Sequence, residues 1–234
     1  MLPSLRNVVP LYGRGYLVTD FREYPTGSQP ADWTKRGANT ANLTVSCTSD
    51  ASVLGGRYMS LSKATTDDYT FLTWDKTPSH TDINAIATLY SNFTIPAGTI
   101  AQSLSWRSDA STSPTMMYAS LAVDASSVKN TFRLGKVVAG TNTVLASTAV
   151  ISWNAATYYF IRAESIGTAH QVKFWAVGSA EPSSWGLTAF DSAVTSGTYL
   201  GPFAFFGLTV NSVFRLSYAA AALGSTVSAP MPQG

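Results

Sequence analysis

The chain has 234 residues and a formal net charge of +2, and only 12% of its residues are charged, about half of the ~25% that is usual in soluble domains. Its lysines and arginines form no basic block, which excludes binding to nucleic acid through clustered positive charge. No apolar run of ~20 residues is present, so no membrane insertion is expected. The low charge predicts either a surface packed largely against partner chains or a neutral, secreted-type β protein.

Residues 1–19 are predicted to form an extended arm, because prolines and glycines interrupt them. The arm is too apolar for a free tail, so we expect it to dock on a neighbouring subunit or on its own domain. Its predicted contact residues are Leu2, Leu5, Val8, Val9, Leu11 and Tyr12. The N-terminus lacks a basic start followed by an apolar core and therefore predicts no signal peptide, so we expect use without Sec export.

One β-sandwich domain is predicted over residues 20–218. It begins in turn-like sequence with Phe21, Tyr24 and Trp33 as apolar anchors. Short β runs then alternate with Gly, Pro, Asn and Asp turns, which is typical of a two-sheet sandwich. The predicted strands are 43–47, 57–62, 69–74, 83–93, 101–107, 117–123, 131–138, 144–153, 158–164, 171–177, 203–208 and 212–218. Residues 219–223 have helical periodicity but are too few for a helix, so residues 219–234 are predicted to be a tail that lies on the surface or binds a neighbour.

The clearest local prediction is a β-hairpin of residues 158–164 and 171–177. Both runs alternate and are rich in aromatic and β-branched side chains. Between them lies a short turn over residues 165–168, in which Gly167 is free to take a positive φ. Pro182 ends the second strand, so Trp185 is expected to fold back as a lid over an open edge of the core.

Neither the cysteine nor the histidines carry a catalytic motif. Cys47 stands in the apolar alternation of its strand and is predicted to be a small buried hydrophobe. His80 and His170 lack a neighbouring nucleophile motif, although a triad assembled in space stays open. His170 is predicted to be a polar surface residue that flanks the hairpin.

The hairpin and its flanks also resemble a known family. Trp153, residues 158–162, Gly167, residues 173–175, Glu181-Pro182 and Trp185 together resemble the late strands of concanavalin A-like lectin/glucanase domains. Domains with this signature are often found in bacteriophage tail and virion proteins, and residues 20–34 are similar to the start of such phage jelly rolls. Glu164 departs from the pattern, which has a second arginine there. The resemblance implies a jelly roll of two large antiparallel sheets, whose concave sheet or rim loops carry the sugar site in lectin and glucanase relatives.

A glucanase of this fold would need two carboxylates facing each other on one strand. Neither residues 83–90 nor residues 118–124 place two acidic residues at i and i+2, so no enzyme activity is expected. Asp67, Asp68 and Asp82 are the residue types of a calcium site, but Asp67-Asp68 is favoured as a simple turn before Tyr69. Neither a metal ion nor any other cofactor is predicted.

Carbohydrate binding is predicted at Trp106, Arg107, Asp109 and Trp175, where an aromatic platform would stand beside polar groups that orient a sugar. The alternative for Trp106 and Trp175, as for Trp74, Tyr90 and Tyr118, is a place in the core, which is the more common fate of strand aromatics.

The main functional expectation is a non-enzymatic bacteriophage virion structural protein, in a tail fibre, a baseplate, or a head decoration or spike. It would be made in the bacterial host cytoplasm, assemble through its arm and sandwich edges with other virion proteins and with itself, and form a trimer. The alternative is a carbohydrate-binding host-recognition module that binds a cell-surface glycan.

Overall fold

Two antiparallel β-sheets make up the structure, a computed structural model that describes residues 16–37, 40–63, 70–91, 100–123, 130–148, 154, 156–204, 213–224 and 228–232. The predicted arm residues, Leu2 to Tyr12, lie outside these ranges. Two short 3-10 turns, η1 (Thr40–Asn42) and η2 (Leu54–Gly56), are the helical elements of the described ranges. In this part of the chain, no helix is long and apolar enough to cross a membrane.

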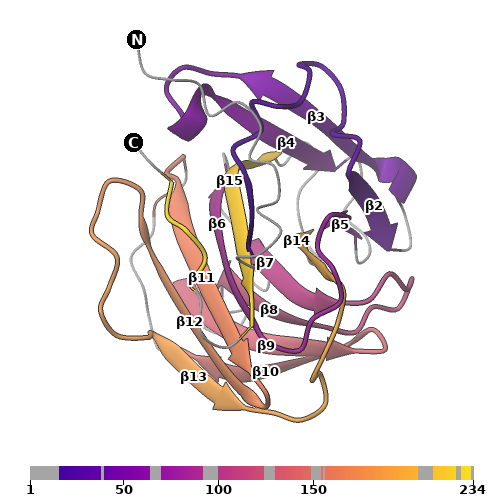
Figure 1. The fold of residues 1–234 in the computed structure, drawn as a ribbon, viewed down its shortest axis with the longest axis vertical. Coiled ribbons are helices and arrows are strands. Elements are labelled where there is room, and N and C mark those ends of the chain that lie inside the picture. Colours follow the sequence, from indigo (N-terminus) through magenta and orange to yellow (C-terminus); the bar gives the residue numbers. More distant parts are fainter. Residues whose placement is uncertain are drawn as a thin grey trace.

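The first sheet has eight strands, and β15 lies near its middle (Figure 1). Its order is β13 (Leu187–Phe190), β12 (Ala169–Ala176), β11 (Tyr159–Ile166), β6 (Ile83–Ser91), β15 (Val213–Leu223), β4 (Arg57–Lys63) and β3 (Leu43–Ser49). The eighth strand, β1 (Tyr16–Thr19), pairs with the second half of β15.

The second sheet has seven strands. Its order is β10 (Thr141–Ser147), β9 (Asn130–Val138), β8 (Met116–Val123), β7 (Ile100–Ser108), β14 (Tyr199–Ala204), β5 (Thr70–Trp74) and β2 (Trp33–Gly37). Neighbours far apart in the sequence, such as β14 beside β5 and β7, show that chain order and sheet order differ.

The main core lies between the two sheets and is built from every second residue of each strand, as strand geometry requires. Trp33 on β2 and Trp74 on β5 stack with their ring centroids 5.5 Å apart. Phe132 on β9 meets Phe174 on β12 across the sandwich at 4.7 Å. Cys47 is 1% exposed within this core, which confirms its prediction, and burial raises the pKa of its thiol to about 11.

The predicted hairpin is confirmed as β11 and β12, which pair along their full length. Its turn is tighter than predicted, because Ser165 and Ile166 still belong to β11 and only Gly167 and Thr168 connect the strands. Gly167 has a φ of 55°, the left-handed conformation that a primed two-residue turn needs.

The alanine run at residues 219–223 is the end of β15 rather than part of a tail. Ala219 and Ala221 face the main core, whereas Ala220 and Ala222 face outward and are also fully buried. Alanine has a low strand propensity, but small side chains fit here because β15 is covered on both faces. Strands β1, β2 and β13 were not predicted; β1 takes in the last four residues of the expected arm.

One half of the outer face of the eight-stranded sheet is apolar and is covered by the C-terminal segment, which lies along β11 in Figure 1. Phe160, Trp175 and Tyr218 pack there with Ala229 and Met231. The backbone of Ala229 accepts a hydrogen bond from Arg162 at 2.9 Å and donates one to Asn84 at 3.1 Å. Residues 228–232 thus pack against the outer face of this sheet, with Ala229 buried.

The Glu181–Trp185 loop folds over the same face of β12, not over an edge of the core. Glu181 Oε1 lies 2.8 Å from both Arg162 Nε and Lys173 Nζ. The Trp185 ring lies 4.8 Å from Lys173 Nζ. Glu164, the departure from the family pattern, accepts hydrogen bonds from Asn84 and Gln171 instead of adding a third cation.

Candidate functional site

Trp106, the central residue of the predicted sugar platform, lies inside the sandwich. Its indole is 0% exposed, and its Nε1–H donates to Ser165 Oγ at 2.7 Å. Ser165 Oγ lies 2.7 Å from His170 Nδ1, and His170 Nε2 lies 3.1 Å from the carbonyl oxygen of Asp191. The three side chains form a buried relay that links β7 of one sheet to β11 and β12 of the other.

The relay determines the state of His170. A carbonyl oxygen only accepts hydrogen bonds, so Nε2 carries the hydrogen, and Nδ1 of the neutral ring accepts from Ser165. Burial is the main cause that lowers the pKa of His170. The prediction that His170 is a surface residue is wrong: the side chain is 1% exposed, because it closes a polar gap in the core.

The Ser165–His170 pair is not a hydrolytic triad. Ser165 is 0% exposed, and its hydroxyl contacts Nδ1 of His170. The group on the other side of the His170 ring is the backbone carbonyl of Asp191 instead of a carboxylate. A nucleophile has to reach its substrate, so this pair has a structural role.

Arg107, the next predicted site residue, is also 0% exposed. Its guanidinium donates to the carbonyl oxygens of Val194, at 2.8 Å, and of Thr81, and one of its nitrogens lies 4.0 Å from Asp82. Its φ of 50° turns the end of β7 inward, and Gly197 packs so closely that an added Cβ would lie 2.1 Å from the Arg107 carbonyl carbon. Arg107 therefore holds rim loops together and has no surface left for a sugar.

The other two predicted residues lie elsewhere. Asp109 follows β7 and caps its own turn, accepting from the backbone and hydroxyl of Ser111 at 3.1 and 2.7 Å. Trp175 is 5% exposed on the outer face of the other sheet, stacked on Phe160 at 5.2 Å. The structure thus does not bring the four predicted carbohydrate-binding residues into one site.

The rim near Arg107 carries an open depression of about 430 Å³, lined by Ser79, His80, Thr81, Asp82, Leu223 and Gly224. Asp82 accepts a hydrogen bond from the Gly167 backbone at 2.9 Å. Within the described ranges, no group of three or more His, Cys, Asp or Glu side chains is placed to hold a metal ion. Asp67 and Asp68, which the sequence favours as a turn rather than a calcium site, lie outside the described residues.

A second surface, on the outer face of β3, β4, β15 and β6, carries aromatic and polar side chains that are not enclosed in the core as Trp106 and Arg107 are. Strands β3 and β4 alternate strictly: Leu43, Val45, Cys47, Met59 and Leu61 face the core, so the residues between them face outward. We call this surface the hydroxyl face and define it as Thr44, Ser46, Thr48, Tyr58, Ser60, Ser62, Tyr90, Tyr158 and Arg215. All of them are exposed or half-buried except Tyr58, which is 8% exposed.

Strand register aligns the centre of the hydroxyl face. Ser46 pairs with Ser60, Ser60 with Arg215, and Arg215 with Tyr90, so one row of side chains crosses four strands. Tyr158 continues the row, with its ring 4.7 Å from that of Tyr90. Burial raises the pKa of the Tyr158 hydroxyl.

Arg215 lies between two aromatic rings, from the strands on either side of its own. Its guanidinium carbon is 4.5 Å from the centre of the Tyr58 ring and 4.8 Å from that of Tyr90. In the part of the chain that the structure describes, no carboxylate lies within 4.0 Å of its nitrogens. The stacking holds the planar cation in place and leaves its charge without an ion-pair partner.

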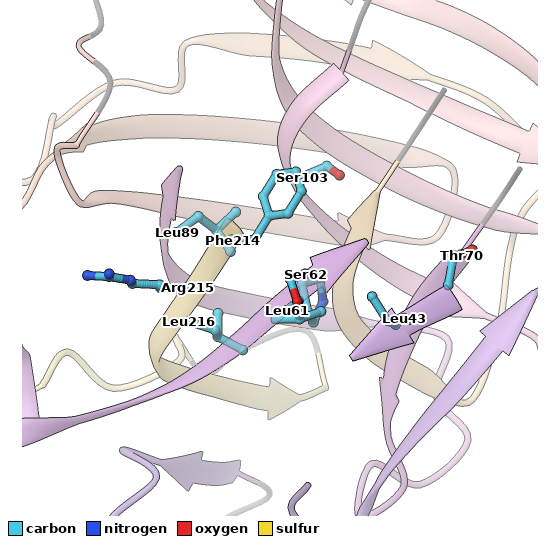
Figure 2. A pocket seen from close by; sticks show the side chains of 10 residues that line it. Leu43, Leu61, Ser62, Thr70, Leu89, Ser103, Phe214, Arg215 and Leu216 are labelled. Atoms are coloured by element: carbon cyan, nitrogen blue, oxygen red, sulfur yellow. The ribbon is translucent and has the colours of Figure 1, made fainter. Parts of the chain in front are cut away.

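Behind Arg215, between the sheets, lies a small cavity of about 20 Å³. Figure 2 shows its largely apolar lining, with Leu61, Leu89 and Phe214, and shows Arg215 extending away from the other side chains. A space of this size holds about one water molecule, so the cavity is a packing gap and not a ligand site.

Sequence reasoning missed the hydroxyl face, although one signal was present. The alternation in LTVSCTS was used to place Cys47 in the core, and the same alternation, continued in RYMSLSK, places a serine- and threonine-rich outer row. Tyr90, Tyr158 and Arg215 come from distant parts of the chain, so only strand order shows that they meet.

Comparison with known proteins supports the fold. No family model matches the sequence, and no curated protein shows significant similarity to it. Among solved structures, carbohydrate-binding module CBM66 from Bacillus subtilis is similar with a TM-score of 0.56 and 17% identity, over 85% of this chain and 99% of that one.

Two further structures are similar over most of their length. The VIP36 exoplasmic/lumenal domain in its Ca²⁺/Man-bound form has a TM-score of 0.59 and 12% identity, over 94% of this chain and 97% of that one. The Emp47p carbohydrate recognition domain has a TM-score of 0.55 and 11% identity, over 85% and 92%.

The chain is thus an all-β protein with a jelly-roll, concanavalin A-like lectin fold, as the sequence predicts. At 11–17% identity, these similarities show the fold alone. The virion role and location stay predictions.

Proposed function

We propose that the chain is a non-catalytic carbohydrate-binding module, and that the hydroxyl face is its binding surface. The observation that carries this proposal is the row of Ser46, Ser60, Arg215 and Tyr90 across four strands, which Tyr158 continues beside β11. Tyrosine offers an apolar ring and a polar tip at a low entropic cost. Serine hydroxyls both donate and accept, as the hydroxyls of a sugar do.

The fold makes this surface suitable for a ligand. Its backbone belongs to paired strands, so the side chains are positioned by sheet register and not by a mobile loop. Similar structures include a carbohydrate-binding module and a carbohydrate recognition domain, which supports this class of ligand. The other half of the same sheet face is apolar and already packed, whereas most of the hydroxyl face is exposed or half-buried among the described residues.

A glycan array followed by titration calorimetry tests the proposal. We expect a bound glycan whose affinity falls about ten-fold or more in Tyr90→Ala, equivalent to ~1.4 kcal/mol. Tyr199→Ala is the matched control, because Tyr199 is a half-buried tyrosine beside an arginine on the other sheet. Absence of binding to any glycan, or equal losses in both variants, would refute the hydroxyl face as the site.

Self-association is a second candidate property, and the edge of the eight-stranded sheet favours it. Phe190 on edge strand β13 is 82% exposed, and Ile166, 40% exposed, belongs to the same cross-strand row through Ala169. An exposed apolar edge promotes strand pairing between copies. The expected trimer and virion partners stay predictions. The solution mass of the full chain and of Phe190→Ser tests self-association, and a monomer in both cases would contradict assembly through this edge.

A further inference from the structure

We infer that the sugar bound at the hydroxyl face is acidic, and that Arg215 recognises its oxyanion. This inference rests on the proposed function and adds a ligand class to it. It starts from the charge of Arg215, which is surrounded by tyrosines and serines instead of carboxylates.

Other cations of the described ranges that stack on tyrosine rings have carboxylate partners. Arg36 also stacks on a tyrosine, Tyr199, at 5.2 Å, but it lies 3.5 Å from Asp75 and donates to Thr73. Lys76 lies near Tyr24 and pairs with Asp32 at 2.7 Å. In both cases a carboxylate balances the stacked cation.

Among the described residues, no carboxylate balances Arg215 in this way. The acidic residue whose charge interacts with it is Asp50, which lies beyond ion-pair distance and accepts hydrogen bonds from Ser52 at 2.6 and 2.9 Å. A guanidinium held flat by two rings keeps its outer N–H groups in a fixed fork, which suits a carboxylate or another oxyanion. Less side-chain freedom is then lost when an anion binds.

The neighbouring groups fit the rest of such a ligand. Ser60 and Ser46 lie in the Arg215 row on one side, and Tyr90 and Tyr158 on the other. An acidic sugar would place its oxyanion at the guanidinium and its hydroxyls toward the serines and the Tyr90 hydroxyl. A uronic acid and a sulfated sugar share this chemistry.

The test compares three probes of equal length: an oligogalacturonate, the corresponding neutral galactose oligosaccharide, and the same neutral oligosaccharide carrying sulfate esters. We expect either or both acidic probes to bind at least ten-fold more tightly than the neutral one, and the preferred probe identifies a uronate or a sulfate ligand. Arg215→Gln should remove this preference, so that the acidic and neutral probes bind with similar affinity. Arg215→Lys, which retains the positive charge but not the paired N–H donors of the guanidinium, should keep only part of the preference for the acidic probe.

Arg36→Gln is the matched control, because it removes the same charge and a similar tyrosine stack from the other sheet. Circular dichroism checks that each variant is folded. Equal binding of acidic and neutral probes, lost in Tyr90→Ala, would overturn this inference and leave the proposed function standing. An acidic preference that survives in Arg215→Gln, or falls equally in Arg36→Gln, would also overturn it. Failure of all probes, together with a negative glycan array, would count against the proposed function itself.

Discussion

Replacing Ser165 by alanine tests the buried relay that joins the two sheets. The hydroxyl of Ser165 accepts from Trp106 Nε1–H at 2.7 Å and lies 2.7 Å from His170 Nδ1. Without it, two polar groups in fully or nearly fully buried side chains lose their partner. Leaving one buried polar group unsatisfied costs about 1–3 kcal/mol, so we expect the free energy of unfolding to fall by about 2–6 kcal/mol.

Urea denaturation, followed by tryptophan fluorescence and circular dichroism, measures this loss. Thr188→Ala is the control, because it removes an exposed hydroxyl from β13 and should change the stability by less than about 0.5 kcal/mol. A double-mutant cycle with Trp106→Phe isolates the Trp106–Ser165 bond. A loss below about 1 kcal/mol in Ser165→Ala, or no coupling in the cycle, would refute the view that the relay stabilises the sandwich.

Three further predictions concern the same framework. Burial lowers the pKa of both His80 and His170 below 6.5, so the unfolded chain binds more protons than the folded chain below that pH. The free energy of unfolding should therefore fall as the pH drops through about 6.5. A pH series of urea denaturation checks this, and a flat profile between pH 7 and 5 would contradict it. Gly197→Ala would place its Cβ 2.1 Å from the Arg107 carbonyl carbon and should lower the melting temperature strongly. Gly186→Ala, whose Cβ would have its nearest contact at 3.4 Å, should lower it only slightly, and similar melting temperatures in the two variants would disprove the close packing. Glu181→Gln leaves Arg162 and Lys173, with side chains 5% and 10% exposed, without their carboxylate. We expect the free energy of unfolding to fall by about 2–3 kcal/mol, less than for a fully buried pair, because Glu181 is 27% exposed. Unchanged stability in urea would show that the ion pair is dispensable.

The hairpin shows what sequence patterns predict well. Residues 159–176 alternate, are rich in aromatic side chains and contain a glycine at the turn, and the structure forms β11 and β12 there. These signals are local, because strand periodicity and turn conformation depend on neighbouring residues. Cys47 was placed correctly for the same reason.

The misplaced residues depend on contacts far apart in the chain. Alternation assigns the residues of a strand to two faces but does not show whether both faces are covered. Trp106 and Trp175 were therefore predicted to be available for a ligand. His170 looked like a surface residue because its partners, Ser165 and Trp106, come from the turn's other strand and from the opposite sheet. The alanine run of β15 lacked a strand signal, since its fit depends on the layers packed on both faces.

By itself, the sequence determined that this chain is an all-β protein, where most of its strands lie and which side chains alternate on them, because those properties follow from composition and short-range periodicity. Only the tertiary structure decided which strands are neighbours. That order places Arg215 between Tyr58 and Tyr90, with no carboxylate of the described residues at ion-pair distance, and it buries Arg107 beneath the rim loops. A surface site depends on which distant side chains meet and which stay uncovered, and pairing between strands far apart in sequence sets both.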